Sequence, residues 1–415
     1  MGKSSLIVGL DIGTTKICAV VGYVNDDGEV EVVGIGNSVS KGMRKGMVVN
    51  IEQTVQSIRN AIEDAELMAG CQINAVYAGI AGSHILSLNS DGMVVVKGGE
   101  ITQRDVDRVL EASRIHSLPA EREELHMLPQ EFIIDGHRGI VDPLGMTGHR
   151  LEVKVHIVTG AVASAQNIIR ACQRSQLEVA DLALESLASA KAALTQEERE
   201  IGVALVDLGG GTTDIAIFAN DSIKHTEVLA LGGQNFSNDI AFGLRTPLAA
   251  AEKIKIKYGC CLCDLVQQDE YIEVPRVGGR SPDTVSRQVL AQICEPRMDE
   301  LLRMVDQILV RSGYRDMLGA GIVLTGGAAL MEGCAELGRE IFGLPTRIGY
   351  PLQISGLKDV VHSPKCSTAV GLLRYGAERE KVAGHSGRGR YASHNEAGMF
   401  ESILAKMRKW FQDIS

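Results

Sequence analysis

The order of apolar and polar positions is the same in two distant stretches of the chain. Residues 203–219 run as an apolar segment into Asp207, pass through three glycines and two threonines, and leave as a second apolar segment. Residues 8–22 repeat this order, with Asp11 at the corresponding position. β-type segments on both sides of a glycine-rich turn predict a hairpin. Because the repeat recurs at about half the chain length, it predicts two similar domains rather than a solenoid.

Both predicted turns suit a bound phosphate group. Glycine backbone can approach an anion closely and direct N–H groups at it, and threonine hydroxyls add further donors. An acid where the strand meets the turn can orient a hydrated metal ion. Each turn alone is explained equally well as an ordinary tight hairpin. Two such hairpins in one chain favour the phosphate interpretation, in which they hold one polyphosphate between them.

The rest of the chain alternates strand and helix patterns, which predicts an α/β fold. A helix is expected to begin directly after Gly326-Gly327, where a strand ends. Periodicity predicts strands over 29–35, 75–81, 177–182 and 322–325, a strand and turn over 271–280, and helices over 51–69, 161–175, 184–194, 287–312 and 367–375.

A separate insert is predicted at residues 84–160. No catalytic constellation occurs in it, so it is either an interaction module or a decoration of the fold. The pattern predicts strands over 85–96 with a turn at 89–92, a helix over 102–116, and strands over 125–134 and 151–159.

Three charged residues near the repeats are candidates for chemistry. Glu185 begins a predicted helix shortly before the second hairpin, and its carboxylate could position a water for attack on a terminal phosphate. The simpler interpretation is a solvated first-turn acid favoured by the helix dipole. Glu252 and Lys255 lie three residues apart on one predicted helix face. They form either an exposed ion pair or a hydrogen-bonding pair for a ribose.

The end of the chain changes character. Residues 378–397 lack apolar periodicity and are predicted to be a flexible linker. Residues 398–415 then form an amphipathic pattern that includes the single tryptophan. Bulky apolar residues opposite cationic ones favour a helix lying in a membrane interface over one docked on the core or on a partner. The predicted membrane-binding residues are Met399, Phe400, Ile403, Leu404, Met407, Trp410 and Phe411.

Composition narrows the function classes. A net charge of −10 argues against a broad nucleic-acid surface. The chain runs from Met1 straight into a strand-like segment, so no signal peptide is expected. No run of about 18 apolar residues occurs, so no membrane span is expected. The nine cysteines are scattered and fit reduced thiols. The cluster Cys260-Cys261-Leu-Cys263 has no second pair nearby, which argues against zinc.

In this order, the motifs resemble those of the actin–Hsp70–sugar kinase superfamily and, more closely, of the FtsA family of bacterial cell-division proteins. The resemblance covers essentially the whole chain. It rests on the paired Asp-Gly-Thr-Thr hairpins, the Glu-x-x-Lys helix, Thr-Gly-Gly-Ala at 325–328, Leu-Gly-Gly-x-x-Phe-x-x-Asp-Ile at 231–240, Gly-Leu-Arg-Thr-Pro at 243–247, Ala-Glu-Lys-Ile-Lys-x-x-Tyr-Gly at 251–259 and the amphipathic tail.

This resemblance implies a duplicated actin-like ATPase fold with an inserted α+β subdomain and a C-terminal amphipathic helix. The implied parts are subdomain 1A at 1–83 and 161–195, 1C at 84–160, 2A at 196–229 and 311–380, 2B at 230–310, a linker at 381–397 and the membrane-targeting helix at 398–415.

The resemblance also implies a site for ATP and Mg²⁺. Asp11 and Asp207 would coordinate the metal, largely through water, and Glu185 would occupy the position of a water-orienting group. Hydrolysis is weak or absent in much of the family, so enzymatic activity stays open. The implied nucleotide-binding residues are Gly13, Thr14, Thr15, Lys16, Gly209, Gly210, Gly211, Thr212, Thr213, Gly233, Glu252, Lys255, Gly326 and Gly327.

The implied function is membrane tethering of the FtsZ ring. Proteins of this family polymerise head to tail, bind the C-terminal peptide of FtsZ through 2B and recruit later division proteins through 1C. The expected location is the cytoplasmic face of the inner membrane at the division site, with membrane lipid as a partner and no nucleic acid. The alternatives are a small-molecule kinase of the same superfamily and a PilM-like pilus-assembly protein.

Overall fold

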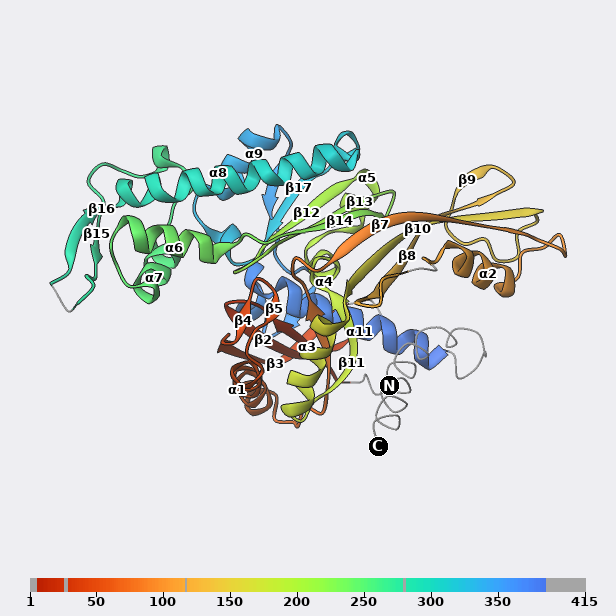
Figure 1. Cartoon of the computed structure of the whole chain (residues 1–415), viewed down its shortest axis with the longest axis horizontal. Helices are drawn as coiled ribbons and strands as arrows, with labels where there is room; N and C mark the ends of the chain where they lie inside the picture. Colours follow the sequence, from red (N-terminus) through yellow and green to blue (C-terminus); the bar gives the residue numbers. More distant parts are fainter. Residues whose placement is uncertain (1–5, 26–28, 116–117, 279–280, 386–415) are drawn as a thin grey trace.

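Two large sheets form the centre of the protein, as seen in a computed structural model that describes residues 6–25, 29–115, 118–278 and 281–385 (Figure 1). The first sheet has the strand order β11-β6-β1-β2-β3-β19. Its strands are β1 (Ile7–Ile12), β2 (Lys16–Val24), β3 (Val30–Val39), β6 (Ala75–Ile80), β11 (Glu178–Leu184) and β19 (Ile354–Gly356).

The second sheet repeats this topology with the order β14-β13-β12-β17-β18. Each sheet is built on an antiparallel hairpin, β1–β2 or β12–β13, which a third antiparallel strand extends on one side and parallel strands on the other. The duplicated α/β fold is therefore confirmed. The strands are β12 (Val203–Leu208), β13 (Thr213–Ala219), β14 (Ser222–Leu229), β17 (Gly321–Thr325) and β18 (Thr346–Ile348).

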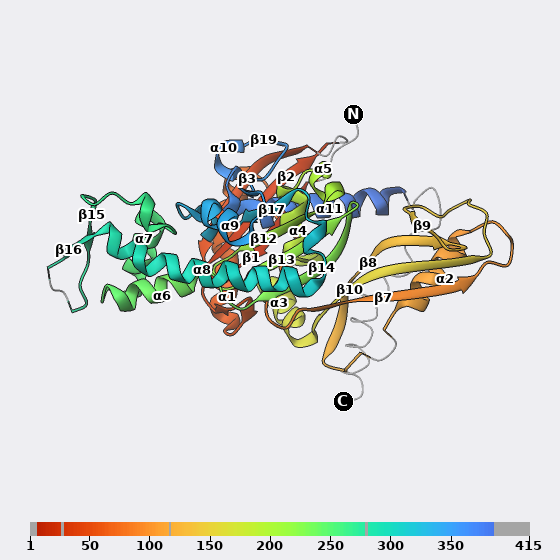
Figure 2. The same ribbon diagram turned by 90° about the horizontal axis from the view of Figure 1, so that it is seen from above.

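Helices cover the outer faces of both sheets (Figures 1 and 2). Helix α1 (Ile51–Ala69) begins where the Asn50 side chain accepts a hydrogen bond from the Gln53 N–H, and it ends at Gly70, whose φ is 65°. Its apolar stripe packs on β1 and β2 together with α3 (Val162–Arg174). Over the second sheet lie the 26-residue α8 (Arg287–Ser312) and α9 (Cys334–Phe342), whereas α6 (Gly233–Gly243) and α7 (Leu248–Tyr258) lie to one side of it, with α6 packed on both α7 and α8 (Figures 1 and 2).

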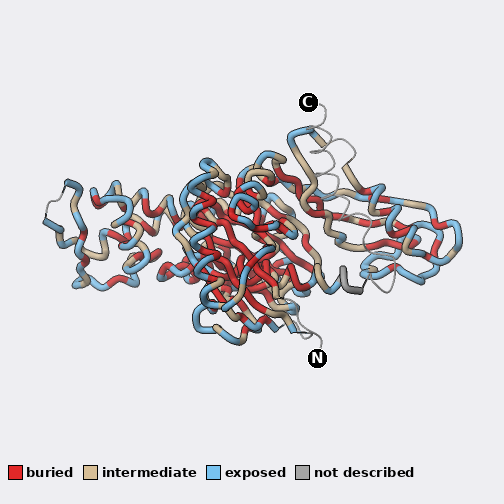
Figure 3. Tube along the Cα trace, turned by 90° about the horizontal axis from the view of Figure 1, so that it is seen from below, coloured by how far each residue is buried: buried red, intermediate tan, exposed pale blue. Residues whose placement is uncertain are grey.

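Two helices lie between the sheets. Helix α4 (Glu185–Ala193) packs its alanines on the second sheet and on α11 (Ser367–His385), which also contacts the first sheet. The two helices approach so closely that a Cβ placed on Gly371 would lie 1.7 Å from the carbonyl oxygen of Ala188. The buried residues concentrate in this central part of the molecule (Figure 3). Movement of one sheet relative to the other must therefore involve this helix pair.

The insert forms its own four-stranded sheet, with the order β7-β10-β8-β9. Its β7 is one continuous strand, so the turn predicted at 89–92 is wrong. A Cβ on Gly92 would lie 2.3 Å from the carbonyl oxygen of Val109, which belongs to the helix at 103–113. Gly92 is therefore required by the close approach of that helix and not by a turn. The elements are β7 (Leu86–Val95), α2 (Gln103–Ser113), β8 (Arg122–Ile134), β9 (His137–Ile140) and β10 (Arg150–Ala161).

The insert also touches the edge of the second sheet, where β7 lies beside β14 (Figure 1). The Ser87 hydroxyl donates a hydrogen bond of 2.7 Å to the carbonyl oxygen of Thr226. The remaining elements are short: β4 (Met43–Arg44), β5 (Met47–Val48), α5 (Gln196–Ile201), β15 (Tyr271–Val274), β16 (Asp283–Ser286), α10 (Lys358–Val361) and 3-10 turns at Cys263–Leu265, Arg315–Met317, Ala328–Leu330 and Pro364–Cys366.

Helix α11 is longer than the pattern predicted. It continues to His385, ten residues beyond the predicted end at 375 and eight residues into 378–397, the range predicted as a flexible linker. The rest of that linker and the amphipathic segment 398–415 lie outside the described residues. In the part of the chain that the structure describes, no helix has the length and apolar character needed to cross a membrane.

Candidate functional site

The two glycine-rich turns meet face to face. A Cβ placed on Gly210 would lie 2.3 Å from Oγ1 of Thr15, and one on Gly211 would lie 2.4 Å from Oγ1 of Thr14. No side chain fits at either glycine while the turns are in contact. The glycines of the second turn are therefore required by the approach of the first turn, and the structure brings both predicted phosphate-binding turns to one place.

Lys16 leaves the first turn and reaches the other half of the molecule. Its Nζ donates a hydrogen bond of 2.7 Å to the carbonyl oxygen of Lys365. Thr14 is held from the other side, because its hydroxyl accepts a hydrogen bond of 3.0 Å from the N–H of Gly46. The first turn thus contacts both halves of the chain.

Four carboxyl groups gather at these turns. Asp11 is the second-last residue of β1, Asp207 and Asp214 lie opposite each other on β12 and β13, and Glu185 begins α4. Burial, followed by repulsion from Asp207, raises the pKa of Asp11 to about 7. Burial and repulsion from Asp207 raise the pKa of Asp214 to about 8. Burial, followed by repulsion from Asp11, raises the pKa of Glu185 well above its usual value. The site therefore holds more buried acid than its own side chains neutralise.

Asp207 is the acid with the most hydrogen-bond partners. Its Oδ2 accepts hydrogen bonds from Ser189 of α4 at 2.6 Å and from Thr368 of α11 at 3.2 Å. Its Oδ1 lies against Gly326, whose φ of 86° and missing side chain keep that space open. Asp207 thus connects the hairpin to both central helices. The sequence did not identify Ser189 or Thr368.

Asp214 was also missed by the sequence analysis. It is 2% exposed, and its Oδ1 has no hydrogen-bond partner. The hairpin register could have found it: a four-residue turn that places Leu208 opposite Thr213 also places Asp207 opposite Asp214. Pairing the residues of the two strands outward from the turn therefore predicts a second acid opposite the first.

Glu185 is partly buried and faces the other acids. A Cβ on Gly79 would lie 2.9 Å from its Cγ and 3.1 Å from its Oε1, so the side chain lies along the β6 backbone. The other three acids raise its pKa further by repulsion. Glu185 is therefore not a solvated acid in the first turn of its helix, so the simpler interpretation from the sequence is wrong.

His126 of the insert fixes the start of α4. The N–H of Leu184, directly before Glu185, donates a hydrogen bond of 3.0 Å to its Nε2. Complete burial, helped by the nearby Arg379 and Lys191 cations, lowers the pKa of His126 to about 3. The ring also meets the edge of Tyr375 of α11, with centroids 6.2 Å apart. A neutral histidine thus links the insert, α4 and α11, and no sequence signal identified it.

Glu252 and Lys255 form a network rather than an exposed ion pair. Lys255 is 9% exposed, and its Nζ donates hydrogen bonds to Glu252 at 2.7 Å, to the Gly233 carbonyl oxygen at 2.9 Å and to the Ser237 hydroxyl at 3.0 Å. The N–H of Gly233 in turn donates to the carbonyl oxygen of Gly209 at 2.8 Å. The structure therefore joins these predicted nucleoside contacts to the second of the two turns predicted to bind phosphate.

The predicted helix after Gly326-Gly327 is wrong. A single 3-10 turn, Ala328–Leu330, follows the glycines, and α9 begins only at Cys334. Gly327 has room around it, since its nearest neighbour to an added Cβ is 3.7 Å away on Lys365. The close neighbours of position 326 therefore explain why it is a glycine, whereas nothing near position 327 excludes a side chain.

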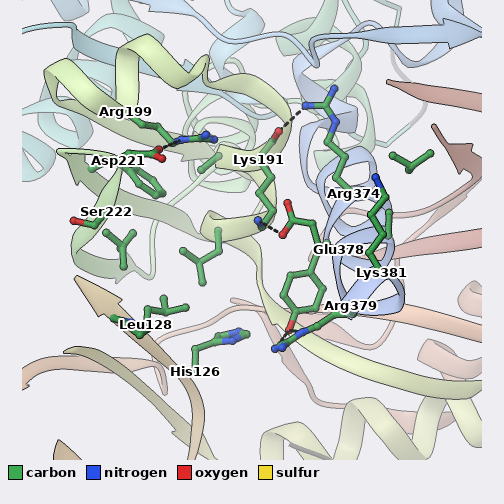
Figure 4. Close-up of a pocket in the computed structure, with 18 of the residues that line it drawn as sticks. His126, Leu128, Lys191, Arg199, Asp221, Ser222, Arg374, Glu378, Arg379 and Lys381 are labelled. Carbon is green, nitrogen blue, oxygen red and sulfur yellow. Dashed lines mark hydrogen bonds and ion pairs between the residues drawn. The ribbon is translucent and has the colours of Figure 1, made fainter. Parts of the chain in front are cut away.

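A cavity of about 590 Å³ lies apart from this site, between β8, α4, α11 and the β13–β14 turn (Figure 4). Ion pairs cross it, between Lys191 and Glu378 at 2.5 Å and between Arg199 and Asp221 at 2.8 Å. His126 lies on its wall. The cavity holds none of the residues predicted to bind a nucleotide.

Comparisons with known proteins agree with this architecture. A family model described as cell division protein FtsA matches residues 204–371, and one described as the SHS2 domain inserted in FtsA matches residues 82–159. The cell division protein FtsA of Pseudomonas aeruginosa is 51% identical over 416 residues, covering 99% of this chain and 98% of its own. The Escherichia coli K12 protein of the same name is 44% identical over 417 residues, covering 99% and 96%.

Two solved structures share the fold. The PilM–PilN type IV pilus biogenesis complex matches with a TM-score of 0.64 and 17% identity, covering 89% of this chain and 98% of its own. MreB5 of Spiroplasma citri bound to ADP matches with a TM-score of 0.57 and 14% identity, covering 92% and 98%. Such low identities establish an actin-like fold alone. The relatives that match over nearly the whole chain go further: this chain belongs to the FtsA family of cell division proteins.

Proposed function

We propose that this chain is an ATP-binding, actin-like scaffold of the bacterial division site. It polymerises head to tail on the inner membrane, tethers the FtsZ ring and recruits later division proteins. The observation that carries the nucleotide part is the meeting of two duplicated Gly-Thr-Thr turns beside a cluster of buried acids. The MreB5 structures bound to ADP and to AMPPNP support nucleotide binding by this fold.

The predicted nucleotide contacts fit one ligand. Backbone N–H groups and threonine hydroxyls of Gly13–Thr15 and Gly209–Thr213 would bind the phosphates, with Lys16 as the nearby cation. Glu252, Lys255 and Gly233 would bind the sugar side, and Gly326 would let the backbone approach the nucleoside. Because the turns touch each other now, ligand binding requires them to separate slightly.

The acids fit a hydrated magnesium ion. Asp11, Asp207 and Asp214 are buried acids that repel one another when ionised, and Oδ1 of Asp214 has no hydrogen-bond partner. Among the described residues, no group of three or more His, Cys, Asp or Glu side chains is placed to hold a metal ion directly, so the proposal is a metal held mostly through water. Bound Mg²⁺ would neutralise phosphate charge, and Glu185 would orient a water near the terminal phosphate.

The tethering function depends on parts that the described residues do not include. Residues 398–415 would lie in the membrane interface, with Trp410 on the apolar face, and 381–397 would connect them to the core. FtsZ would bind subdomain 2B at 230–310, and later division proteins would bind 1C at 84–160. Subdomains 1A at 1–83 and 161–195 and 2A at 196–229 and 311–380 would hold the nucleotide.

Vesicle co-sedimentation tests the tether. FtsZ should pellet with anionic vesicles only when this chain is present, and removal of 398–415 should abolish pelleting. Trp410→Glu should do the same, because it places a charge on the apolar face, whereas Gln412→Glu adds that charge on the polar face and should pellet normally. FtsZ that stays in the supernatant with the intact chain contradicts the tethering proposal.

Calorimetric titration tests the nucleotide site. Asp207→Ala should weaken Mg²⁺–ATP binding by about tenfold or more, since it removes an acid at the centre of the site. Asp142→Ala, a change in an exposed loop of the insert, is the matched control and should bind normally. Equal affinity of the Asp207→Ala variant and the unaltered chain would remove Asp207 from the site.

A further inference from the structure

Two buried hydroxyl groups from different helices meet at one oxygen of Asp207. The Ser189 hydroxyl of α4 donates a hydrogen bond of 2.6 Å to Oδ2, and the Thr368 hydroxyl of α11 lies 3.2 Å from the same oxygen. The two hydroxyl oxygens are 3.0 Å apart. Both side chains are buried, and the family resemblance assigns neither of them to phosphate, nucleoside or metal. The core thus contains a hydroxyl pair directly beside an acid of the predicted site.

Each hydroxyl has one hydrogen to donate, which limits how the pair can be arranged. Hydroxyl hydrogen bonds to oxygen are about 2.5–3.0 Å long, so the hydrogen of Ser189 goes to Asp207. Thr368 can donate to Ser189 at 3.0 Å or to Asp207 at 3.2 Å, and the shorter contact favours Ser189. Ser189 is therefore the direct partner of Asp207, and Thr368 fixes the direction of the Ser189 hydroxyl.

The other oxygen of Asp207 is kept clear. Among the residues that the structure describes, none donates a hydrogen bond to Oδ1. A Cβ on Gly326 would lie 2.3 Å from Oδ1, so any side chain at that position would push the carboxylate away. Asp207 also keeps 7% exposure. The core therefore holds one oxygen of this acid and leaves the other to accept hydrogen bonds from a ligand or its water.

We propose that Ser189, oriented by Thr368, is a positioning residue that holds Oδ2 of Asp207 and leaves Oδ1 for the water shell of a hydrated divalent cation. This role rests on the proposed ATP and Mg²⁺ site. Mg²⁺ usually keeps several of its waters in proteins, and those waters need acceptors that point towards them. Side chains that bond a metal-binding group from behind fix its direction, and their loss typically costs about 10–100-fold in metal affinity or activity.

A second hydroxyl pair at the start of α11 provides the comparison. Ser367, the residue before Thr368, has its hydroxyl 2.7 Å from that of Thr325, which lies opposite Asp207 on the neighbouring strand β17. Both side chains are buried. The Thr325 hydroxyl also bonds the carbonyl oxygen of Gly349 at 3.0 Å, so this pair is joined to the backbone rather than to an acid. Ser367→Ala therefore removes a buried hydroxyl from the same helix turn without removing a partner of Asp207.

Nucleotide titration of the full chain with Mg²⁺ and with EDTA tests the role toward the metal. Ser189→Ala should weaken Mg²⁺–ATP binding by about tenfold. Thr368→Val, which keeps the shape of the side chain, should weaken it by about threefold. Both variants should bind ATP in EDTA within about twofold of the unaltered chain. Thr368→Ser, which keeps the hydroxyl, and Ser367→Ala should retain the full effect of Mg²⁺.

Two results of these titrations overturn the proposal. Equal losses with Mg²⁺ and with EDTA would mean that Ser189→Ala acts through packing alone, because a loss of packing affects both titrations. A normal effect of Mg²⁺ in Ser189→Ala, or no effect of Mg²⁺ on an unaltered chain that binds ATP, would remove the role toward the metal. An unaltered chain that binds no ATP contradicts the proposed function instead.

A double-mutant cycle in the ligand-free chain tests the contact itself and needs no nucleotide. Urea unfolding gives the shift in midpoint that Ser189→Ala causes in the unaltered chain and in Asp207→Ala. Because the hydroxyl loses its acceptor in Asp207→Ala, the shift should fall there to less than about half. Ser367→Ala should shift the midpoint equally in both chains. Equal shifts for Ser189→Ala in the two chains overturn the proposal.

Discussion

The buried His126 should make the stability of the protein depend on pH in a way that one substitution removes. Its Nε2 accepts the hydrogen bond from the Leu184 N–H and is therefore neutral in the folded chain. His126→Gln can keep an acceptor near that position but cannot titrate. His126→Leu keeps an apolar volume and removes the acceptor. Comparing the two variants separates the effect of protonating the side chain from the effect of losing the hydrogen bond.

The magnitude follows from the pKa in the two states. Folding lowers the pKa of His126 from 6.5 to about 3, so its contribution is complete above 6.5 and is lost as the pH falls towards 3. At about 1.4 kcal/mol per pH unit, the whole gap amounts to about 5 kcal/mol. Between pH 7 and pH 5 the free energy of unfolding should fall by about 2 kcal/mol from this residue alone.

Urea titrations at pH 7 and pH 5 measure the effect. The loss on acidification should be about 2 kcal/mol smaller in His126→Gln than in the unaltered chain. Burial also lowers the pKa of His156 to about 3, but both chains contain His156, so its contribution cancels in this difference. His126→Leu should lose an additional 1–3 kcal/mol or so at pH 7, because the Leu184 N–H is left buried without a partner. His149→Gln, with a side chain 88% exposed, is the control and should change neither quantity.

Parallel pH profiles for the unaltered chain and His126→Gln would refute the reasoning. That result would mean that His126 is protonated, or free to leave the core, in the folded protein. A normal pH 7 stability of His126→Leu would separately show that the Leu184 N–H finds another partner.

Two further predictions concern the central site and the helix pair. Asp214→Asn should stabilise the ligand-free chain by more at pH 8 than at pH 6. The folded acid keeps its proton up to about pH 8 whereas the unfolded acid loses it near 3.8, so the stability cost of the acid grows between these two pH values. The substitution should also reduce the gain in ATP affinity on adding Mg²⁺. Thermal unfolding and titration with and without a chelator measure both effects, and equal stabilisation at the two pH values counts against the raised pKa. Gly371→Ala should lower the free energy of unfolding by about 1–3 kcal/mol, because the new methyl meets the Ala188 carbonyl oxygen, whereas Gly243→Ala meets only the flexible end of Ile293 and should cost less. Equal urea midpoints for these two variants would show that α4 and α11 separate easily.

The parts predicted correctly from sequence are those whose signals are local. The hairpins at Asp11 and Asp207 each carry their strands, acid and turn within about 17 residues, and their repetition predicted the duplicated fold. Asp214 was within reach of the same reasoning through the hairpin register. The amphipathic segment 398–415 is equally local and stays a prediction.

The parts that were missed depend on partners far along the chain. His126 is 58 residues from Leu184, and Thr368 is 161 residues from Asp207, so no window of sequence contains either contact. The turn predicted at 89–92 failed for a related reason. Its glycine is required by α2, which packs over it, and Asn89 bonds His156 across the sheet at 2.7 Å. Tertiary packing, rather than chain reversal, selects these turn-forming residues.

Helix α11 can convert a small tilt at its first turn into a larger movement at its far end. Its first turn holds Thr368 against Asp207, and its last residue, His385, is where the remaining 30 residues of the chain begin. Its 19 residues span about 28 Å, so a tilt of about 5° at the first turn moves the far end by about 2–3 Å. A small displacement beside the acids therefore becomes a movement of about the width of a side chain at His385, the last residue that the structure describes.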